Sequence, residues 1–181
     1  MAKMEIRLAG SGGQGIILAT VILAEAAIIA GKHTAQSQSY GPEARGGACK
    51  AEVIVSDTEI GFTKVQTPTF LMALTQKSLD KYSKNLPKDC LVLIDEGLSV
   101  PQNLDGYKVI KLPILSTAEE KVGRRMTANI VAVAAINGLL KLVDDESLKT
   151  AVFMHIPKGT EALNEKALNE GFKLIENGGN Q

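Results

Sequence analysis

Two glycine-rich segments contain the residues of this sequence that are best suited to bind a charged ligand. The first reads GSGGQG over residues 10–15 and follows a short segment of alternating polar and apolar residues. The second reads SYGPEARGG over residues 39–47 and adds a tyrosine, a carboxylate and a guanidinium to its glycines and proline. A plain connector needs no such side chains, so both segments are candidates for a functional site.

The first segment matches the pattern G-x-G-x-x-G between an expected strand and an expected helix. Glycines of this kind let the backbone approach a phosphate, and the helix N-terminus offers N–H donors and the positive end of its dipole. The residues that we therefore predict to bind a cofactor are Gly10, Gly12, Gly13, Gln14 and Gly15.

The common nucleotide motifs do not fit the residues that follow. A dinucleotide site expects an acidic residue about 20 positions after the glycines, whereas residues 33–38 read HTAQSQ. No Lys-Ser or Lys-Thr pair follows the loop, which excludes a P-loop. Two interpretations stay open. The loop meets a phosphate or carboxylate of a ligand, or its glycines let an apolar helix pack closely on the sheet.

The second segment is predicted to form a turn that contacts a ligand or a partner chain. Proline fixes φ at this turn, and the glycine pair that ends the segment allows a close backbone approach. Arg45 can bind a carboxylate or a phosphate in a bidentate manner, although pairing with neighbours that merely holds the loop is the open alternative. The predicted contact residues are Ser39, Tyr40, Gly41, Pro42, Glu43, Arg45, Gly46 and Gly47, together with Gln76 at the end of a later strand.

Short apolar strands alternate with helices along the chain, which is the pattern of an α/β domain. Strands are expected at 5–9, 32–38, 49–55, 59–62, 70–74, 90–94 and 107–112, and helices at 16–30, 78–85, 117–123, 128–143, 147–153 and 161–170. The turn Ser56-Asp57 is expected to fold 49–55 and 59–62 into a hairpin. The sequence predicts one domain over residues 1–181, a three-layer α/β/α sandwich with a mixed, mostly parallel central sheet.

This fold predicts where the two glycine-rich segments lie. If the strands before them are parallel neighbours, both segments lie at the carboxyl edge of the sheet, where open α/β sheets bind ligands. Gln14 and Tyr40 are then expected at the same end of the molecule.

Composition excludes several classes of protein. Lys+Arg and Asp+Glu balance at 20 each, so no basic excess points to nucleic acid. The longest apolar run, at 16–30, is too short to span a bilayer, and no secretory signal is evident, so a cytoplasmic protein is expected. Cys49 and Cys90 are the only cysteines and lie far apart, and His33 and His155 are isolated. We therefore expect neither a metal site nor a catalytic residue in this chain.

Several further polar residues are interpreted as structural or as subunit contacts. Asp95-Glu96 ends a buried strand and is expected to cap a helix or hold a turn. Arg124-Arg125 is interpreted as a solvated pair or a subunit contact, with a phosphate clamp as the alternative. Asn129 and Asn137 lie eight residues apart in an apolar helix and are expected to bond a neighbouring loop or chain.

Taken together, the two motifs resemble the gamma subunit of 2-oxoacid:ferredoxin oxidoreductases, of the 2-oxoglutarate or branched-chain 2-oxoacid type. The segments ALTQKSLDKY at 73–82 and TANIVAVAAINGLL at 127–140 are also similar to segments of that family, in which Asn is commoner than Thr75. The resemblance covers most of the chain. It is specific because the two glycine-rich motifs occur together.

The resemblance implies an accessory subunit of a heterotetramer with alpha, beta and delta subunits. Such an enzyme decarboxylates a 2-oxoacid on thiamine diphosphate and Mg, reduces ferredoxin through iron–sulfur clusters, and transfers the acyl group to coenzyme A. The resemblance places thiamine diphosphate and the clusters on other subunits, and this chain near the coenzyme A path or the active-site entrance. The open alternatives are a free-standing nucleotide-binding protein that uses residues 10–15, and a structural domain that forms a homodimer.

Overall fold

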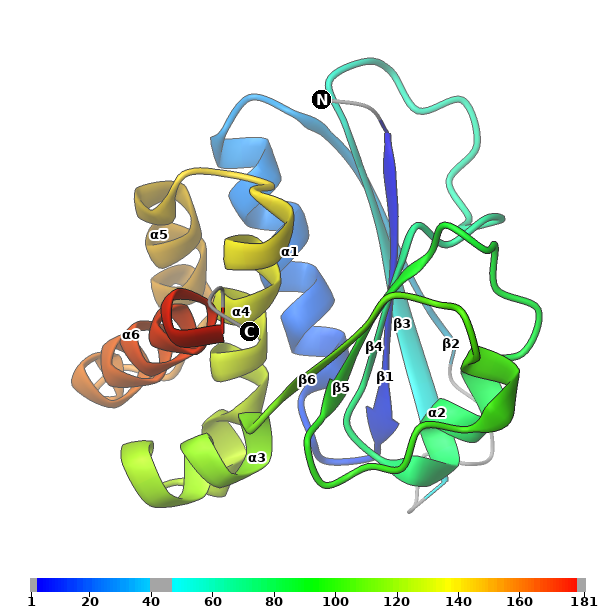
Figure 1. Cartoon of the computed structure of the whole chain (residues 1–181). Helices are drawn as coiled ribbons and strands as arrows, with labels where there is room; N and C mark the ends of the chain where they lie inside the picture. The colour runs from blue at the N-terminus through cyan, green and yellow to red at the C-terminus, as the bar shows by residue number, and fades with distance from the viewer. Residues whose placement is uncertain (1–2, 40–46, 179–181) are drawn as a thin grey trace.

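A six-stranded sheet runs through the molecule, with helices on both of its faces (Figure 1). The computed structural model describes residues 3–39 and 47–178. The strands are β1 (Met4–Ser11), β2 (His33–Ser39), β3 (Ala48–Ser56), β4 (Phe70–Ala73), β5 (Leu91–Asp95) and β6 (Val109–Leu112). The helices are α1 (Ile16–Ile29), α2 (Gln76–Tyr82), α3 (Ile114–Ser116), α4 (Ala128–Leu140), α5 (Asp145–His155) and α6 (Glu161–Gly178). The shorter helical segments are η2 (Gln102–Leu104), η3 (Thr117–Val122) and η4 (Arg125–Thr127).

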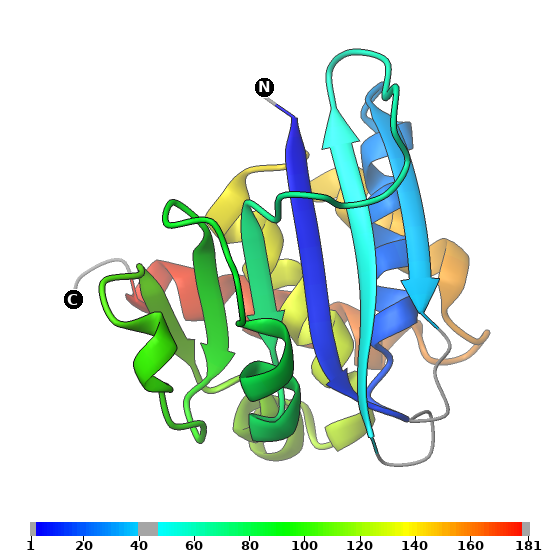
Figure 2. The ribbon, with the colours of Figure 1, turned by 90° about the vertical axis from the view of Figure 1, so that its right-hand side faces the viewer.

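The sheet is mixed and mostly parallel, as predicted. Its strand order is β2-β3-β1-β4-β5-β6, which can be followed in Figure 2. The pairs β1–β4, β4–β5 and β5–β6 are parallel, whereas β3 is antiparallel to both β1 and β2. Among the described strands, β3 alone therefore runs against the others, and the carboxyl ends of β1 and β2 lie at the same edge.

The predicted hairpin between 49–55 and 59–62 is wrong. Residues 57–69 form a connection without a strand, and both edges of β3 are already paired, with β1 and with β2. The connection is held by Glu5, whose Oε2 accepts from the N–H groups of Gln66 at 2.7 Å and Thr67 at 2.8 Å. The local turn at Ser56-Asp57 therefore does not form a hairpin, because β3 pairs with strands that are more distant in the sequence.

The helices form two unequal layers, which confirms the predicted sandwich. In Figure 1, α1, α4, α5 and α6 lie on one side of the sheet and α2 on the other. Helix α1 packs against β3 on one side and α5 on the other, which explains why its sequence is apolar nearly all round. None of the described helices is both long and apolar enough to cross a membrane.

Candidate functional site

The two glycine-rich segments begin at the same edge of the sheet. β1 ends at Ser11, opposite Ala48 of β3, and β2 ends at Ser39, opposite Lys50 of β3. β1 and β2 are not neighbours, because β3 lies between them. Their common direction nevertheless puts the GSGGQG loop and both ends of the second segment at the carboxyl edge.

The central residues of the second segment lie outside the described residues. These are Tyr40, Gly41, Pro42, Glu43, Arg45 and Gly46. Ser39 is the last residue of β2, and Gly47 lies at a bend directly before β3. Their predicted contact with a ligand or a partner stays a prediction.

Gly10 and Gln14 shape the GSGGQG loop from within. The Oε1 atom of Gln14 accepts a hydrogen bond from the Ser11 N–H at 2.7 Å. A Cβ on Gly10 would lie 2.6 Å from that Oε1 and 2.9 Å from the Ile16 side chain. Close packing therefore favours glycine at position 10, in agreement with the second of the two interpretations for this residue.

Gly15 opens α1 in a way that leaves its backbone donors available. It is the N-cap residue, with φ of +70° in the left-handed region, and no side chain of the described residues caps the helix. The N–H groups of the first turn and the positive end of the helix dipole therefore remain available to an anion. Gly12 and Gly13, at the tip of the loop, are exposed. This half of the loop supports the first interpretation, binding of a phosphate or carboxylate.

Asn129 brings the start of α4 against the start of α1. A Cβ on Gly15 would lie 2.5 Å from Asn129 Nδ2 and 2.9 Å from its Cγ. The Oδ1 atom of Asn129 accepts from the Ile130 N–H at 3.0 Å. Two helix N-termini therefore meet at the glycine loop. The sequence marked Asn129 as a residue that contacts a neighbouring loop, but its spacing could not identify that loop.

A short exposed turn precedes α4 at this edge. Arg124 and Arg125 are exposed, and Arg125 forms an ion pair with Glu119 at 3.4 Å. Met126, between them and the helix, is 82% exposed. The Thr127 hydroxyl donates to the Arg124 carbonyl at 2.7 Å and fixes the turn. The turn thus offers a cation and an apolar side chain directly before α4, the helix whose Asn129 contacts Gly15.

Gln76 lies at the same edge, but its amide is bonded within the chain. Its Oε1 accepts from the Ser99 N–H at 3.0 Å, and its Nε2 donates to Asp80 and to the Ser99 carbonyl. Asp95 is bonded in a similar way, because its carboxylate accepts from the N–H groups of Gly97 and Leu115. Both residues hold the connection that follows β5, which is the turn role expected for Asp95.

The cysteines are poor candidates for reactive groups. Burial raises the pKa of Cys90 to about 11, and it also raises the pKa of Cys49. Both thiols therefore stay protonated near neutral pH, which disfavours nucleophilic chemistry. In the part of the chain that the structure describes, no three His, Cys, Asp or Glu side chains are placed to hold a metal ion.

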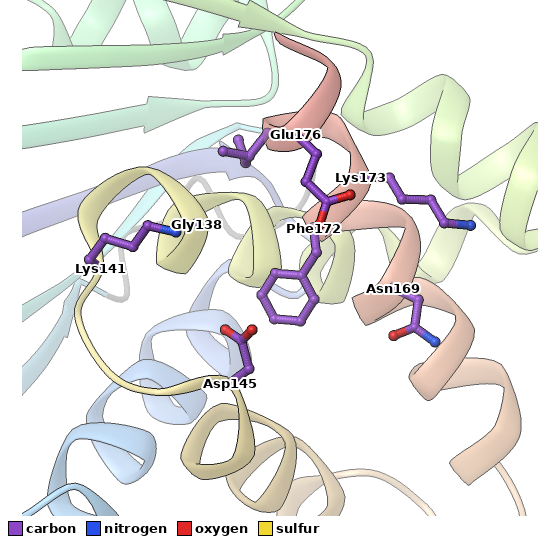
Figure 3. Close-up of a pocket in the computed structure, with 8 residues that line it drawn as sticks. Gly138, Lys141, Asp145, Asn169, Phe172, Lys173 and Glu176 are labelled. Carbon is purple, nitrogen blue, oxygen red and sulfur yellow. The ribbon is translucent and has the colours of Figure 1, made fainter. Parts of the chain in front are cut away.

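A groove of about 390 Å³ lies at the opposite end of α4, between α4, α5 and α6. Figure 3 shows the Phe172 ring between α6 and the carboxylate of Asp145. The residues that line it are Gly138, Lys141, Asp145, Asn169, Phe172, Lys173, Ile175 and Glu176. None of them belongs to either glycine-rich segment, so the groove and the carboxyl edge are separate features.

Comparison with known proteins relates the chain to one family of oxidoreductases. A family model described as "Pyruvate ferredoxin/flavodoxin oxidoreductase" matches residues 5–174. The chain is 43% identical over 177 residues to the 2-oxoglutarate synthase subunit KorC of Methanocaldococcus jannaschii, covering 96% of this chain and 95% of that one.

Solved structures show the same relationship. The crystal structure of the gamma subunit of a keto/oxoacid ferredoxin oxidoreductase from Geobacter sulfurreducens has a TM-score of 0.88 and 42% identity, covering 98% and 99% of the two chains. A 2-oxoglutarate:ferredoxin oxidoreductase from Magnetococcus marinus, at 20% identity, shares the fold with a TM-score of 0.86, covering 98% of this chain and 32% of that one. The chain belongs to the pyruvate ferredoxin/flavodoxin oxidoreductase family.

Proposed function

We propose that the chain is the gamma subunit of a 2-oxoglutarate:ferredoxin oxidoreductase, which converts 2-oxoglutarate to succinyl-CoA and reduces ferredoxin. The observation that carries the proposal is the 43% identity to a 2-oxoglutarate synthase subunit along nearly the whole of both chains. The similarity to a gamma subunit in sequence and fold supports it. We place the complex in the cytoplasm, where the two unpaired thiols would stay reduced.

In this proposal the chain takes part in assembly and in binding coenzyme A. Thiamine diphosphate, Mg and the iron–sulfur clusters are assigned to the alpha, beta and delta subunits, since two distant cysteines cannot ligate a cluster. Coenzyme A supplies the thiol that accepts the acyl group. Its phosphates suit the free helix start at Gly15 and the guanidinium of Arg124, which has no ion-pair partner among the described residues.

The exposed turn before α4 is proposed to contact a neighbouring subunit. If the glycine loop lies on the coenzyme A path, the surface around it faces the catalytic subunits, and Met126 is the exposed apolar side chain there. Met126→Glu should weaken assembly about tenfold or more, because a charge is buried in the interface. Met154→Glu is the matched control, since Met154 is 60% exposed on the outer helix α5. Equal subunit affinities for the two variants would contradict this contact.

The function is tested by expressing the chain with and without the other subunits. The assembled complex should oxidise 2-oxoglutarate with coenzyme A and ferredoxin, and the isolated chain should be inactive. Turnover by the chain alone, or failure to co-purify with the other subunits, would overturn the proposal. Micromolar binding of NAD by the isolated chain in calorimetry would instead favour a free-standing nucleotide-binding protein.

A further inference from the structure

Asn129 is a buried amide with an unused donor. The residue as a whole is 6% exposed. Oδ1 accepts from the Ile130 N–H, which fixes the orientation of the amide, whereas Nδ2 has no hydrogen-bond partner among the described residues. Nδ2 is not fully enclosed by the described residues, so an oxygen from outside the chain can reach it. Because the amides of buried residues are normally bonded on both sides, this donor is expected to bond a water or a ligand oxygen.

The unused donor faces the candidate site. Of all the side-chain atoms around Gly15, Nδ2 of Asn129 lies closest to the position of a Cβ, at 2.5 Å. Gly15 opens α1 without a cap from any described side chain, and Asn129 is the second residue of α4. The positive ends of two helix dipoles therefore act on the oxygen that would accept from Nδ2, and both favour a negatively charged acceptor.

We infer that Asn129 is a ligand-contacting residue, whose Nδ2 donates to an anionic oxygen of the ligand that the glycine loop binds. The inference rests on the proposed function for the identity of that ligand, a phosphate group of coenzyme A. Asn129 acts on binding and not on the reacting atoms, because it lies beside the backbone of the loop. Its Nδ2 and the free N–H groups at the start of α1 would donate to the same anion.

Asn129→Asp separates this role from a structural one. The carboxylate keeps an acceptor for the Ile130 N–H, and its charge is favourable in the first turn of α4. The fold should therefore be as stable as the wild type. The same change removes the donor and directs a negative charge at the anion. Loss of one charge-assisted bond weakens affinity about tenfold or more.

Asn137→Asp is the matched control on the same helix. Asn137 is 1% exposed, and its Nδ2 donates to the Val143 carbonyl at 3.1 Å. Its change to Asp removes a bonded donor far from the glycine loop. This variant should lower the melting temperature and leave affinity for coenzyme A unchanged.

The experiment uses the assembled complex and measures the Kd of coenzyme A by calorimetry, the KM values for both substrates, and kcat. For Asn129→Asp we expect Kd and KM for coenzyme A to rise about tenfold or more, with the KM for 2-oxoglutarate and the melting temperature unchanged. A Kd within twofold of wild type would overturn the inference even if the wild-type complex is fully active. Conversely, a complex that binds coenzyme A through Asn129 but does not oxidise 2-oxoglutarate would overturn only the proposed function.

Discussion

The two ends of helix α4 use the same side chain in opposite ways. At its C-terminal end, the Asn137 amide accepts from the Val143 N–H and donates to the Val143 carbonyl, each at 3.1 Å. At its N-terminal end, Asn129 bonds only the neighbouring Ile130 N–H among the residues that the structure describes, and its donor is unused beside Gly15. One asparagine closes a turn, and the other remains available at the edge where the sheet strands end.

Unused hydrogen-bond donors distinguish the candidate site from the other end of α4. The groove of Figure 3 lies at that other end, near Asn137. At that end, polar groups such as Asn137, Asp144 and Ser147 are bonded to one another or to the backbone. The glycine-loop end keeps free helix donors and an unpaired amide, which are the groups that bind an anion.

The largest effect should come from Asn137→Leu. Removing the amide leaves both the N–H and the carbonyl of Val143 without their partner, so the free energy of unfolding should fall by about 3 kcal/mol. Asn129→Leu, which removes a single bond, should lower it by about 1 kcal/mol. Urea denaturation of both variants measures the difference. Equal losses would mean that the two ends of α4 are bonded alike.

Gly15→Ala should lower the free energy of unfolding by about 2 kcal/mol, through its left-handed backbone and the crowding against Asn129. Gly13→Ala is its control, because Gly13 also has positive φ but no atom of the described residues lies within 4 Å of the added Cβ. The control should lose only the backbone part, about 1 kcal/mol. Similar losses for both variants would rule out tight contact at Gly15.

A double-mutant cycle sharpens this result. Asn129→Ala should relieve the crowding that Gly15→Ala creates, so the double variant should be more stable than the sum of the single losses predicts. A coupling of about 0.5 kcal/mol or more would show direct contact between the two positions. Purely additive losses would argue against it.

Lys141→Gly should stabilise the other end of α4. Lys141 is the C-cap residue and adopts φ of +50°, which strains a residue that has a Cβ. Glycine at this position should raise the free energy of unfolding by about 1 kcal/mol. Lys141→Ala keeps the strain and should give no gain in the same denaturation assay. A lower free energy of unfolding for Lys141→Gly would show that contacts of the lysine side chain stabilise the fold by more than its backbone strain costs.

The smallest effect concerns pH. Hydrogen bonds from the Ser147 N–H and hydroxyl lower the pKa of Asp144, the N-cap of α5. A carboxylate whose folded pKa is lowered stabilises the fold above its usual pKa, near 4, and loses this contribution as pH falls through the lower value. The difference in melting temperature between wild type and Asp144→Asn should therefore shrink as pH falls below about 4. A difference that stays constant with pH would contradict this role.

Local patterns predicted most of the elements and one helix end correctly. The apolar runs located the strands. The helix predicted at 16–30 matches α1, which ends where Gly31, with φ of +75°, and Lys32 donate to the carbonyls of Ile28 and Ala27. The boundaries shifted by a few residues, and α6 extends to Gly178, eight residues beyond the predicted end. The false hairpin after Ser56 shows the limit of such patterns, since pairing partners come from anywhere in the chain.

The α/β class, the two glycine-rich motifs and the family that they resemble are evident from the sequence. Periodicity and glycine spacing are local, and they can be read directly along the chain. The three-dimensional structure was needed to show that β3 separates β1 from β2, that Gln76 is bonded within the chain, and that Asn129 reaches Gly15. Those facts depend on contacts between residues far apart in sequence. Asn129 Nδ2 is an unused donor beside Gly15, where two helix N-termini meet, whereas Asn137 Nδ2 is bonded to the Val143 carbonyl.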